Sequence, residues 1–229
     1  MNRAAILLTL LLFLASASFA TPIIIDPFDQ GFLWQPGILT TFSDTSAVSN
    51  VLGGVRHIDI ANASSPTVGF MALTINNPAV GAAGILDIQS GTNAIPNVRL
   101  LYGNVGSNDL NLDLDSFIAF VFTTDYRDHP GGALIVNLYT NGGGVSSNSI
   151  PVLPAGSSLH TIPLAGFAGT ADMSDVDAIE ILLQGVPNLD MSFDTIELTD
   201  SPEPGTLMLV GMTLVGFGVG YRRFRGRKA

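Results

Sequence analysis

The chain has 229 residues, of which 47% are apolar, 12% are charged and none is cysteine, and its formal net charge is −10. The absence of cysteine excludes disulfides, thiol nucleophiles and zinc–thiolate sites. Residues 21–204 contain three arginines and all nineteen acidic residues, and the resulting formal charge of −16 argues against nucleic-acid binding. The mean hydropathy of +0.43 is high for a wholly soluble protein, and the apolar residues that raise it are concentrated at the two ends of the chain.

Residues 1–20 contain the three parts of a secretory signal peptide in order. A short positive stretch with Arg3 precedes an apolar run from Ile6 to Leu14, and small residues follow up to Ala20. We therefore expect export and cleavage after Ala20, with Ala17 as the competing site. A retained membrane anchor is the alternative, but the apolar run is short for a bilayer-spanning helix.

Residues 21–200 contain short apolar runs that are separated by Gly, Pro, Asn and Ser. The runs have the length of strands and are rich in β-branched and aromatic residues, and turn signals lie between nearly all of them. We expect some nine strands, at Val55–Ile60, Val68–Ile75, Gly84–Ile88, Val98–Tyr102, Phe117–Thr123, Ala133–Thr140, Ser158–Leu164, Ala178–Gln184 and Met191–Leu198. With little helix signal, this pattern predicts an all-β fold, an antiparallel β-sandwich of the jelly-roll type.

Three of these segments have informative residue patterns. Every residue from Phe117 to Phe122 is apolar, which is typical of a central strand buried on both faces or covered by a loop. The alternation from Met191 to Leu198 changes midway, which predicts a bulge near Asp194. Residues 174–183 could form a capped helix, but the strand length of the apolar run favours a turn at 173–176 that leads into a strand.

The segment from Asp109 to Asp115 alternates Asp or Asn with leucine, like the beginning of a calcium loop. It lacks the glycine and the bidentate glutamate of an EF-hand loop. The strict alternation predicts a strand with one apolar face and solvated carboxylates on the other.

Residues 125–131 form a predicted loop with polar and aromatic side chains. Tyr126 could stack on a sugar ring, Asp128 could accept its hydroxyls, and His129 lies beside them, so these three residues are candidate glycan contacts. The alternative is an ordinary solvated loop. His57 and His160 alternate with apolar neighbours and are expected on strand faces rather than in a metal site.

The sequence shows no catalytic constellation. Hydrolysis of a glycoside needs two facing carboxylates, and the only glutamates are Glu180, Glu197 and Glu203. No Gly-x-Ser-x-Gly motif is present. We therefore expect no catalytic residue, no cofactor and no enzymatic activity.

The segment Val176–Glu180 followed by Ser192–Leu198 is similar to the last two strands of galactose-binding-like jelly rolls found in carbohydrate modules. This resemblance implies a structural calcium ion between an acidic residue near the first strand and one in the last, and the matching positions are Asp26 and Asp194. The alternative is that both are ordinary turn or strand-edge carboxylates, because calcium needs several oxygen ligands.

The last part of the chain, residues 201–229, combines three features. Two prolines flank Glu203, the uncharged stretch 205–221 follows, and the basic tail 222–229 ends the chain. As a helix, the uncharged stretch spans about 25 Å, the short limit for crossing a bilayer. The cations that follow it place the tail in the cytoplasm and the body outside.

Together, Pro202-Glu203-Pro204, the apolar helix and the arginine-rich terminus resemble the PEP-CTERM sorting signal of exported bacterial proteins. The resemblance implies processing by an exosortase, a membrane-embedded enzyme that cuts at the motif, in a Gram-negative host that makes exopolysaccharide. The inner membrane is then a transient anchor.

The sequence therefore predicts a non-enzymatic exported protein that ends at the cell surface or in the extracellular matrix, associated with exopolysaccharide or biofilm. A carbohydrate-binding module, with or without calcium, is the alternative interpretation. A secreted hydrolase is a third and less favoured one.

Overall fold

The computed structural model describes residues 22–31, 33–38, 41–63, 70–77, 82–104 and 110–200. The predicted signal peptide and the predicted C-terminal helix lie outside these residues. Within the described part of the chain, no helix is long and apolar enough to cross a membrane. The body Pro22–Thr199 is a compact unit of strands and short 3₁₀ turns, so the predicted all-β fold is confirmed.

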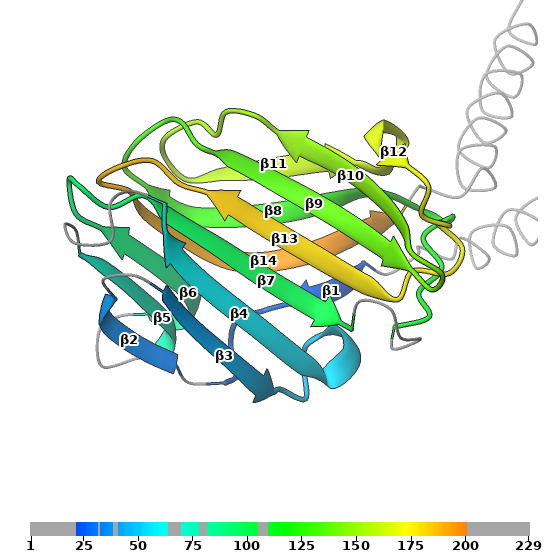
Figure 1. The fold of residues 1–229 in the computed structure, drawn as a ribbon, viewed down its shortest axis with the longest axis horizontal. Coiled ribbons are helices and arrows are strands. Elements are labelled where there is room, and N and C mark those ends of the chain that lie inside the picture. The colour runs from blue at the N-terminus through cyan, green and yellow to red at the C-terminus, as the bar shows by residue number, and fades with distance from the viewer. Residues whose placement is uncertain are drawn as a thin grey trace, which may run out of the picture. The chain divides into compact units, whose positions relative to one another are not determined.

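The strands form two antiparallel sheets that pack face to face (Figure 1). Sheet A has the order β11-β8-β14-β6-β5-β2, with β1 paired to β14. Its strands are β1 (Ile23–Asp26), β2 (Leu33–Ile38), β5 (Met71–Asn77), β6 (Ala82–Ser90), β8 (Phe117–Arg127), β11 (Ser158–Pro163) and β14 (Asp190–Asp200).

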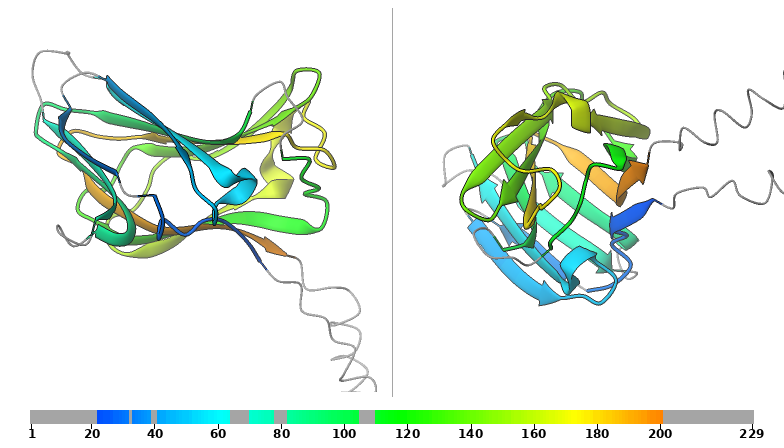
Figure 2. Two further views of the ribbon diagram at one scale, coloured as in Figure 1. Left: turned by 90° about the horizontal axis from the view of Figure 1, so that it is seen from below. Right: turned by 90° about the vertical axis from the view of Figure 1, so that its right-hand side faces the viewer.

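Sheet B has the order β12-β10-β9-β13-β7-β4-β3. Its strands are β3 (Thr41–Ala47), β4 (Val55–Asn62), β7 (Pro96–Gly103), β9 (Ala133–Thr140), β10 (Gly144–Ile150), β12 (Ala168–Gly169) and β13 (Ala178–Gln184). The 3₁₀ turns η1 (Leu52–Gly54) and η3 (Leu164–Gly166) connect strands. Sheet B dips between the two ends of its strands, so its outer face is concave (Figure 2).

The core lies between the sheets and follows from the two-residue period of each strand. In β9, Leu134, Val136 and Leu138 are fully buried, whereas Asn137 and Tyr139 alternate with them and are only half-buried. Because β4, β7 and β9 in the middle of sheet B alternate in this way, the sheet has an apolar inner face and an outer face that carries most of its polar side chains.

Each of the nine predicted strands overlaps an observed one, although the first residues of the predicted Val68–Ile75 lie outside the described part. The all-apolar part of β8 is buried on both faces, from Ala119 to Phe122. In β14 the buried positions change from Met191 and Phe193 to Ile196 and Leu198, as the bulge prediction requires. The predicted turn before β13 is also present.

The predicted strand at 109–115 is wrong for its described residues. Only Leu112 forms a β-bridge, to Val176. Asn111 has a positive φ of 46°, which interrupts the extended backbone, and the carboxylate of Asp113 accepts a hydrogen bond from the amide of Asp115 (2.9 Å). Leu114 is nevertheless buried, so the apolar side of this segment does face the core.

Candidate binding face

The polar residues of sheet B lie in cross-strand register on its outer face. Asp59 on β4 is opposite Arg99 on β7, and in the next row Glu180 on β13 is opposite Asn137 on β9. Side chains in register on one face of a sheet are close enough to interact. The strands therefore bring together residues that are as far as 121 positions apart in the chain, from Asp59 to Glu180.

Arg99 joins two carboxylates across three strands. Its Nη1 donates to Oδ2 of Asp59 at 3.0 Å, and its Nε donates to Oε1 of Glu180. The other oxygen of Glu180 accepts hydrogen bonds from Asn137 Nδ2 and from the hydroxyl of Tyr139, both at 2.7 Å. Ser43 on β3 donates to Asp59. We call these six residues, from five adjacent strands, the Arg99 network.

The electrostatics of the Arg99 network fix its proton positions at neutral pH. Burial alone raises the pKa of Glu180, but the hydrogen bonds from Arg99, Asn137 and Tyr139 outweigh it, so that this pKa is lowered. Burial and the bond to Glu180 raise the pKa of Tyr139 to about 12. In the network, Glu180 is therefore an ionised carboxylate, Arg99 is a guanidinium cation and Tyr139 keeps its phenol proton.

Two hollows lie beside the Arg99 network, along β4 and β7. One has a volume of ≈ 270 Å³ and includes Asp59, Asn97, Arg99 and Gln184 in its lining, with Leu182 as part of its apolar surface. The other has a volume of ≈ 230 Å³ and is lined by Gly53, Val55, His57, Gly103 and Asn104. Fixed donors and acceptors beside apolar surface are typical of small-molecule binding sites.

Among the described residues, the two glutamates form no pair suited to glycoside hydrolysis. Glu180 is in sheet B and Glu197 is in sheet A. The general acid of a glycosidase needs a raised pKa, and the pKa of Glu180 is lowered.

The predicted glycan-contact residues lie at the end of β8 and in the loop that follows. Tyr126 is 55% exposed. Oδ1 of Asp128 accepts a hydrogen bond from the amide of Asp190 (2.9 Å), and Nε2 of His129 lies 3.6 Å from Oδ2 of Asp128 and 3.0 Å from Nδ2 of Asn188. The structure therefore brings Asp128 and His129 together, and the role of the three residues stays a prediction.

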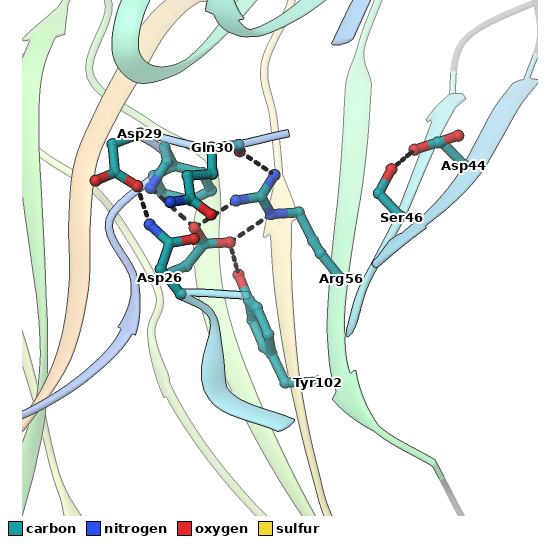
Figure 3. A network of polar contacts seen from close by, with 9 residues as sticks. Asp26, Asp29, Gln30, Asp44, Ser46, Arg56 and Tyr102 are labelled. Carbon is teal, nitrogen blue, oxygen red and sulfur yellow. Dashed lines mark hydrogen bonds and ion pairs between the residues drawn. The ribbon is translucent and has the colours of Figure 1, made fainter. Parts of the chain in front are cut away.

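Asp26, the first residue of the predicted calcium pair, lies in a buried polar cluster (Figure 3). Its Oδ2 accepts from Arg56 Nε (2.5 Å) and from the hydroxyl of Tyr102 (2.8 Å), and its Oδ1 accepts from Arg56 Nη2 (2.5 Å) and from the amide of Phe28 (2.8 Å). A guanidinium thus occupies the place that the prediction gave to a cation.

Asp194, the second predicted ligand, is exposed on β14. Among the described residues, no three His, Asp or Glu side chains form a group that could hold a metal ion. Calcium at Asp26 and Asp194 stays a prediction, and in the structure Asp26 accepts four hydrogen bonds from three other residues.

The Arg99 network was not found from the sequence. Its members are scattered over five strands, and nothing in the linear order shows that Asp59, Arg99 and Glu180 share one face. The available signal was the alternation itself, since Asn97 and Arg99, or Asn137 and Tyr139, occupy every second position of their strands.

Residues 202–223 match the family model described as the PEP-CTERM protein-sorting motif, which confirms that prediction. The motif indicates an exported protein that an exosortase processes at its C-terminus. No curated protein matches the chain.

Several solved structures resemble the body. The family 11 carbohydrate-binding module of the cellulosomal cellulase Lic26A-Cel5E of Clostridium thermocellum is 11% identical, with a TM-score of 0.45 over 80% of this chain and 97% of that one. The family 11 module from Clostridium thermocellum in complex with a beta-1,3-1,4-mixed-linked tetrasaccharide is also 11% identical, with a TM-score of 0.45 over 80% of this chain and 98% of that one. A family 12 xyloglucanase from Bacillus licheniformis is 7% identical, with a TM-score of 0.33 over 74% of this chain and 100% of that one.

Proposed function

We propose that this chain is a non-enzymatic exported protein whose β-sandwich binds an extracellular polysaccharide on the outer face of sheet B. An exosortase releases or re-anchors the body by cutting at Pro202-Glu203-Pro204. Through its polysaccharide the protein becomes part of the cell surface or the biofilm matrix. The observation that carries the binding proposal is the Arg99 network beside two hollows on a concave face.

The network suits the recognition of sugar hydroxyls. Arg99 and Asp59 are each about one-third exposed, with side-chain values of 34% and 38%, so both reach the surface while their positions are fixed by the ion pair. Such preorganised groups lose little entropy when a ligand binds. Asn97 and Gln184 add amide groups at the edge of the larger hollow.

The charge of the body favours a neutral polysaccharide. Asp59 and Glu180 outnumber Arg99 on this face, and residues 21–204 carry a formal charge of −16. A polyanionic chain such as a polyuronate is repelled by that field, most strongly at low salt. We therefore expect binding of neutral polysaccharide that changes little with ionic strength.

Affinity electrophoresis of the full-length chain in polysaccharide-containing gels tests this proposal. The wild-type chain should be retarded by a neutral polysaccharide from the host. Arg99→Ala and Gln184→Ala should each raise the Kd obtained from the retardation by about 10-fold, as expected for the loss of one or two polar contacts to the ligand. Gln184 is exposed, so its replacement leaves the fold intact.

The matched controls are Tyr126→Ala and Asp128→Ala, which remove the predicted loop contacts. If these two variants lose binding and the sheet B variants keep it, the polysaccharide binds at the loop after β8, and the assignment to sheet B is wrong. If no polysaccharide retards the wild-type chain, the protein acts as a structural component of the matrix without specific recognition.

A further inference from the structure

The two hollows on the outer face of sheet B lie one after the other along the same pair of strands. On β4, Ala61 and Asp59 line the larger hollow, and His57 and Val55 line the smaller one. These four residues are every second position of β4, so their side chains share its outer face. The positions 55–61 cover about 20 Å at the rise of a β-strand. Both hollows also include residues of β7, so together they form one track along β4 and β7.

The size of the hollows and the surface between them suit one elongated ligand. On β7 the residue between them is Leu101, which is opposite His57 and only 8% exposed, so it forms apolar surface without protruding as a barrier. The hollows, of ≈ 270 Å³ and ≈ 230 Å³, are each smaller than the about 300–1,000 Å³ typical of a small-molecule site. Taken together they fall within that range, which favours a ligand that occupies both.

His57 offers a polar atom to the smaller hollow, as Asp59 and Arg99 do to the larger one. Its Nδ1 shares a hydrogen bond with Oγ1 of Thr45 on β3 (2.8 Å), which fixes the ring. The second ring nitrogen, Nε2, can then bond a ligand, as a donor or an acceptor according to the tautomer. A sugar hydroxyl both donates and accepts, so it suits either tautomer. The smaller hollow is therefore a second polar contact point for the same sugar chain.

We propose that the polysaccharide lies along β4 and β7 and fills both hollows at once, with one sugar unit at Asp59 and Arg99 and another, further along the chain, at His57. The proposal rests on the binding of polysaccharide by sheet B and adds the class of ligand, a chain of several sugar units in place of a single sugar or a disaccharide. The first unit bound bears most of the loss of translational and rotational freedom, so contacts in the second hollow add to the affinity. Affinity therefore rises with chain length until both hollows are filled.

Isothermal titration calorimetry of the full-length chain in detergent tests the proposal. The ligands titrated are the neutral polysaccharide purified from the host and its acid-hydrolysis fragments, fractionated by size. Fragments long enough to fill both hollows should bind at least about 10-fold more tightly than disaccharides. His57→Ala should raise the Kd of the long fragments about 5-fold, as expected for the loss of one polar contact. The same variant should leave the Kd of disaccharides unchanged, because the larger hollow suffices to hold them.

Two variants control the experiment. Ser149→Ala removes an exposed hydroxyl on β10, three strands from β7 in sheet B, and should change no Kd. Gln184→Ala, in the larger hollow, should weaken the binding of disaccharides and long fragments alike. If His57→Ala does not fold, modification of the wild-type chain by diethylpyrocarbonate replaces it. Long fragments should then slow the modification of His57 several-fold, and disaccharides should not.

The proposal is overturned if disaccharides bind the wild-type chain as tightly as long fragments do. It is also overturned if His57→Ala keeps the wild-type Kd for long fragments, or if these fragments leave the modification of His57 unchanged, because the polysaccharide then occupies the larger hollow alone. If the intact polysaccharide does not bind the wild-type chain, the proposed function itself fails, and the placement along β4 and β7 fails with it.

Discussion

At the residue scale, the Asp26 cluster shows how the fold neutralises a charge inside a sandwich. Asp26 comes from β1 of sheet A, whereas Arg56 and Tyr102 come from β4 and β7 of sheet B, so the cluster ties the two sheets together. Arg56 also lies over the ring of Phe28, 5.3 Å from its centroid. The sequence predicted that Asp26 binds a cation, namely calcium. Its partner is instead Arg56, which is 30 residues away in the chain and could not be identified from the sequence.

Replacing members of this cluster should have unequal effects on stability. Asp26→Asn leaves the guanidinium of Arg56 buried without a counterion, and we expect a loss of about 3–5 kcal/mol in the free energy of unfolding. Tyr102→Phe removes one of four hydrogen bonds to Asp26 and should cost about 1 kcal/mol. Urea unfolding measures both values, and equal losses would contradict the central role of the ion pair.

The stabilising contribution of Glu180 should be lost in acid. Its folded-state pKa is lowered, so its stabilising contribution is complete above the unfolded pKa of about 4.3 and is lost as the pH falls through the folded value. The difference in unfolding free energy between the wild-type chain and Glu180→Gln should therefore shrink between about pH 6 and pH 3. Urea unfolding across this range measures it, and a constant difference would show that Glu180 is not ionised in the network.

At the scale of elements, the sequence revealed nine strands, among them the edge strand β11, and missed β1, β2, β3, β10 and β12. Strands such as β8 and β9 bury apolar side chains, and their composition identified them. Two of the missed strands, β3 and β10, lie at or beside the edge of sheet B, and their sequences TFSDTSA and GVSSNSI are polar because solvent covers much of them. Asp128 and His129 could be proposed from the sequence because they are neighbours in the chain. The Arg99 network could not, because it depends on the register of five strands.

The end of β7 depends on a glycine. Gly103 has a φ of +76°, and a Cβ atom there would lie 2.2 Å from the backbone oxygen of Asp177. We expect Gly103→Ala to lower the free energy of unfolding by about 1–3 kcal/mol more than its control. The control is Gly142→Ala, which also has a positive φ, of +91°, but has no atom within 4 Å of the added Cβ. Similar losses in chemical denaturation would mean that the strand end adjusts freely.

At the scale of the whole molecule, the first and last strands of the body are neighbours. Ile23 in β1 is paired with Leu198 in β14, four residues before the sorting motif begins. The chain therefore enters and leaves the sandwich at adjacent strands of sheet A, whereas the Arg99 network lies on sheet B.

Sorting should depend on Glu203 in the native host. Glu203→Ala removes the carboxylate of the motif, and we expect a larger, membrane-retained form to accumulate. Asp194→Ala removes one exposed negative charge from the folded body and serves as the control, which should be released normally. Immunoblots of membrane and culture fractions distinguish the two, and normal release of the Glu203 variant would contradict processing at the motif.

Carboxyl footprinting by carbodiimide and mass spectrometry is the most direct test of a polysaccharide-binding face on sheet B. In the presence of saturating neutral polysaccharide, labelling of Asp59 should fall several-fold, while labelling of Asp128 in the loop and of the exposed Asp172 stays constant. Protection of Asp128 without protection of Asp59, or no protection of any carboxylate, would contradict the account.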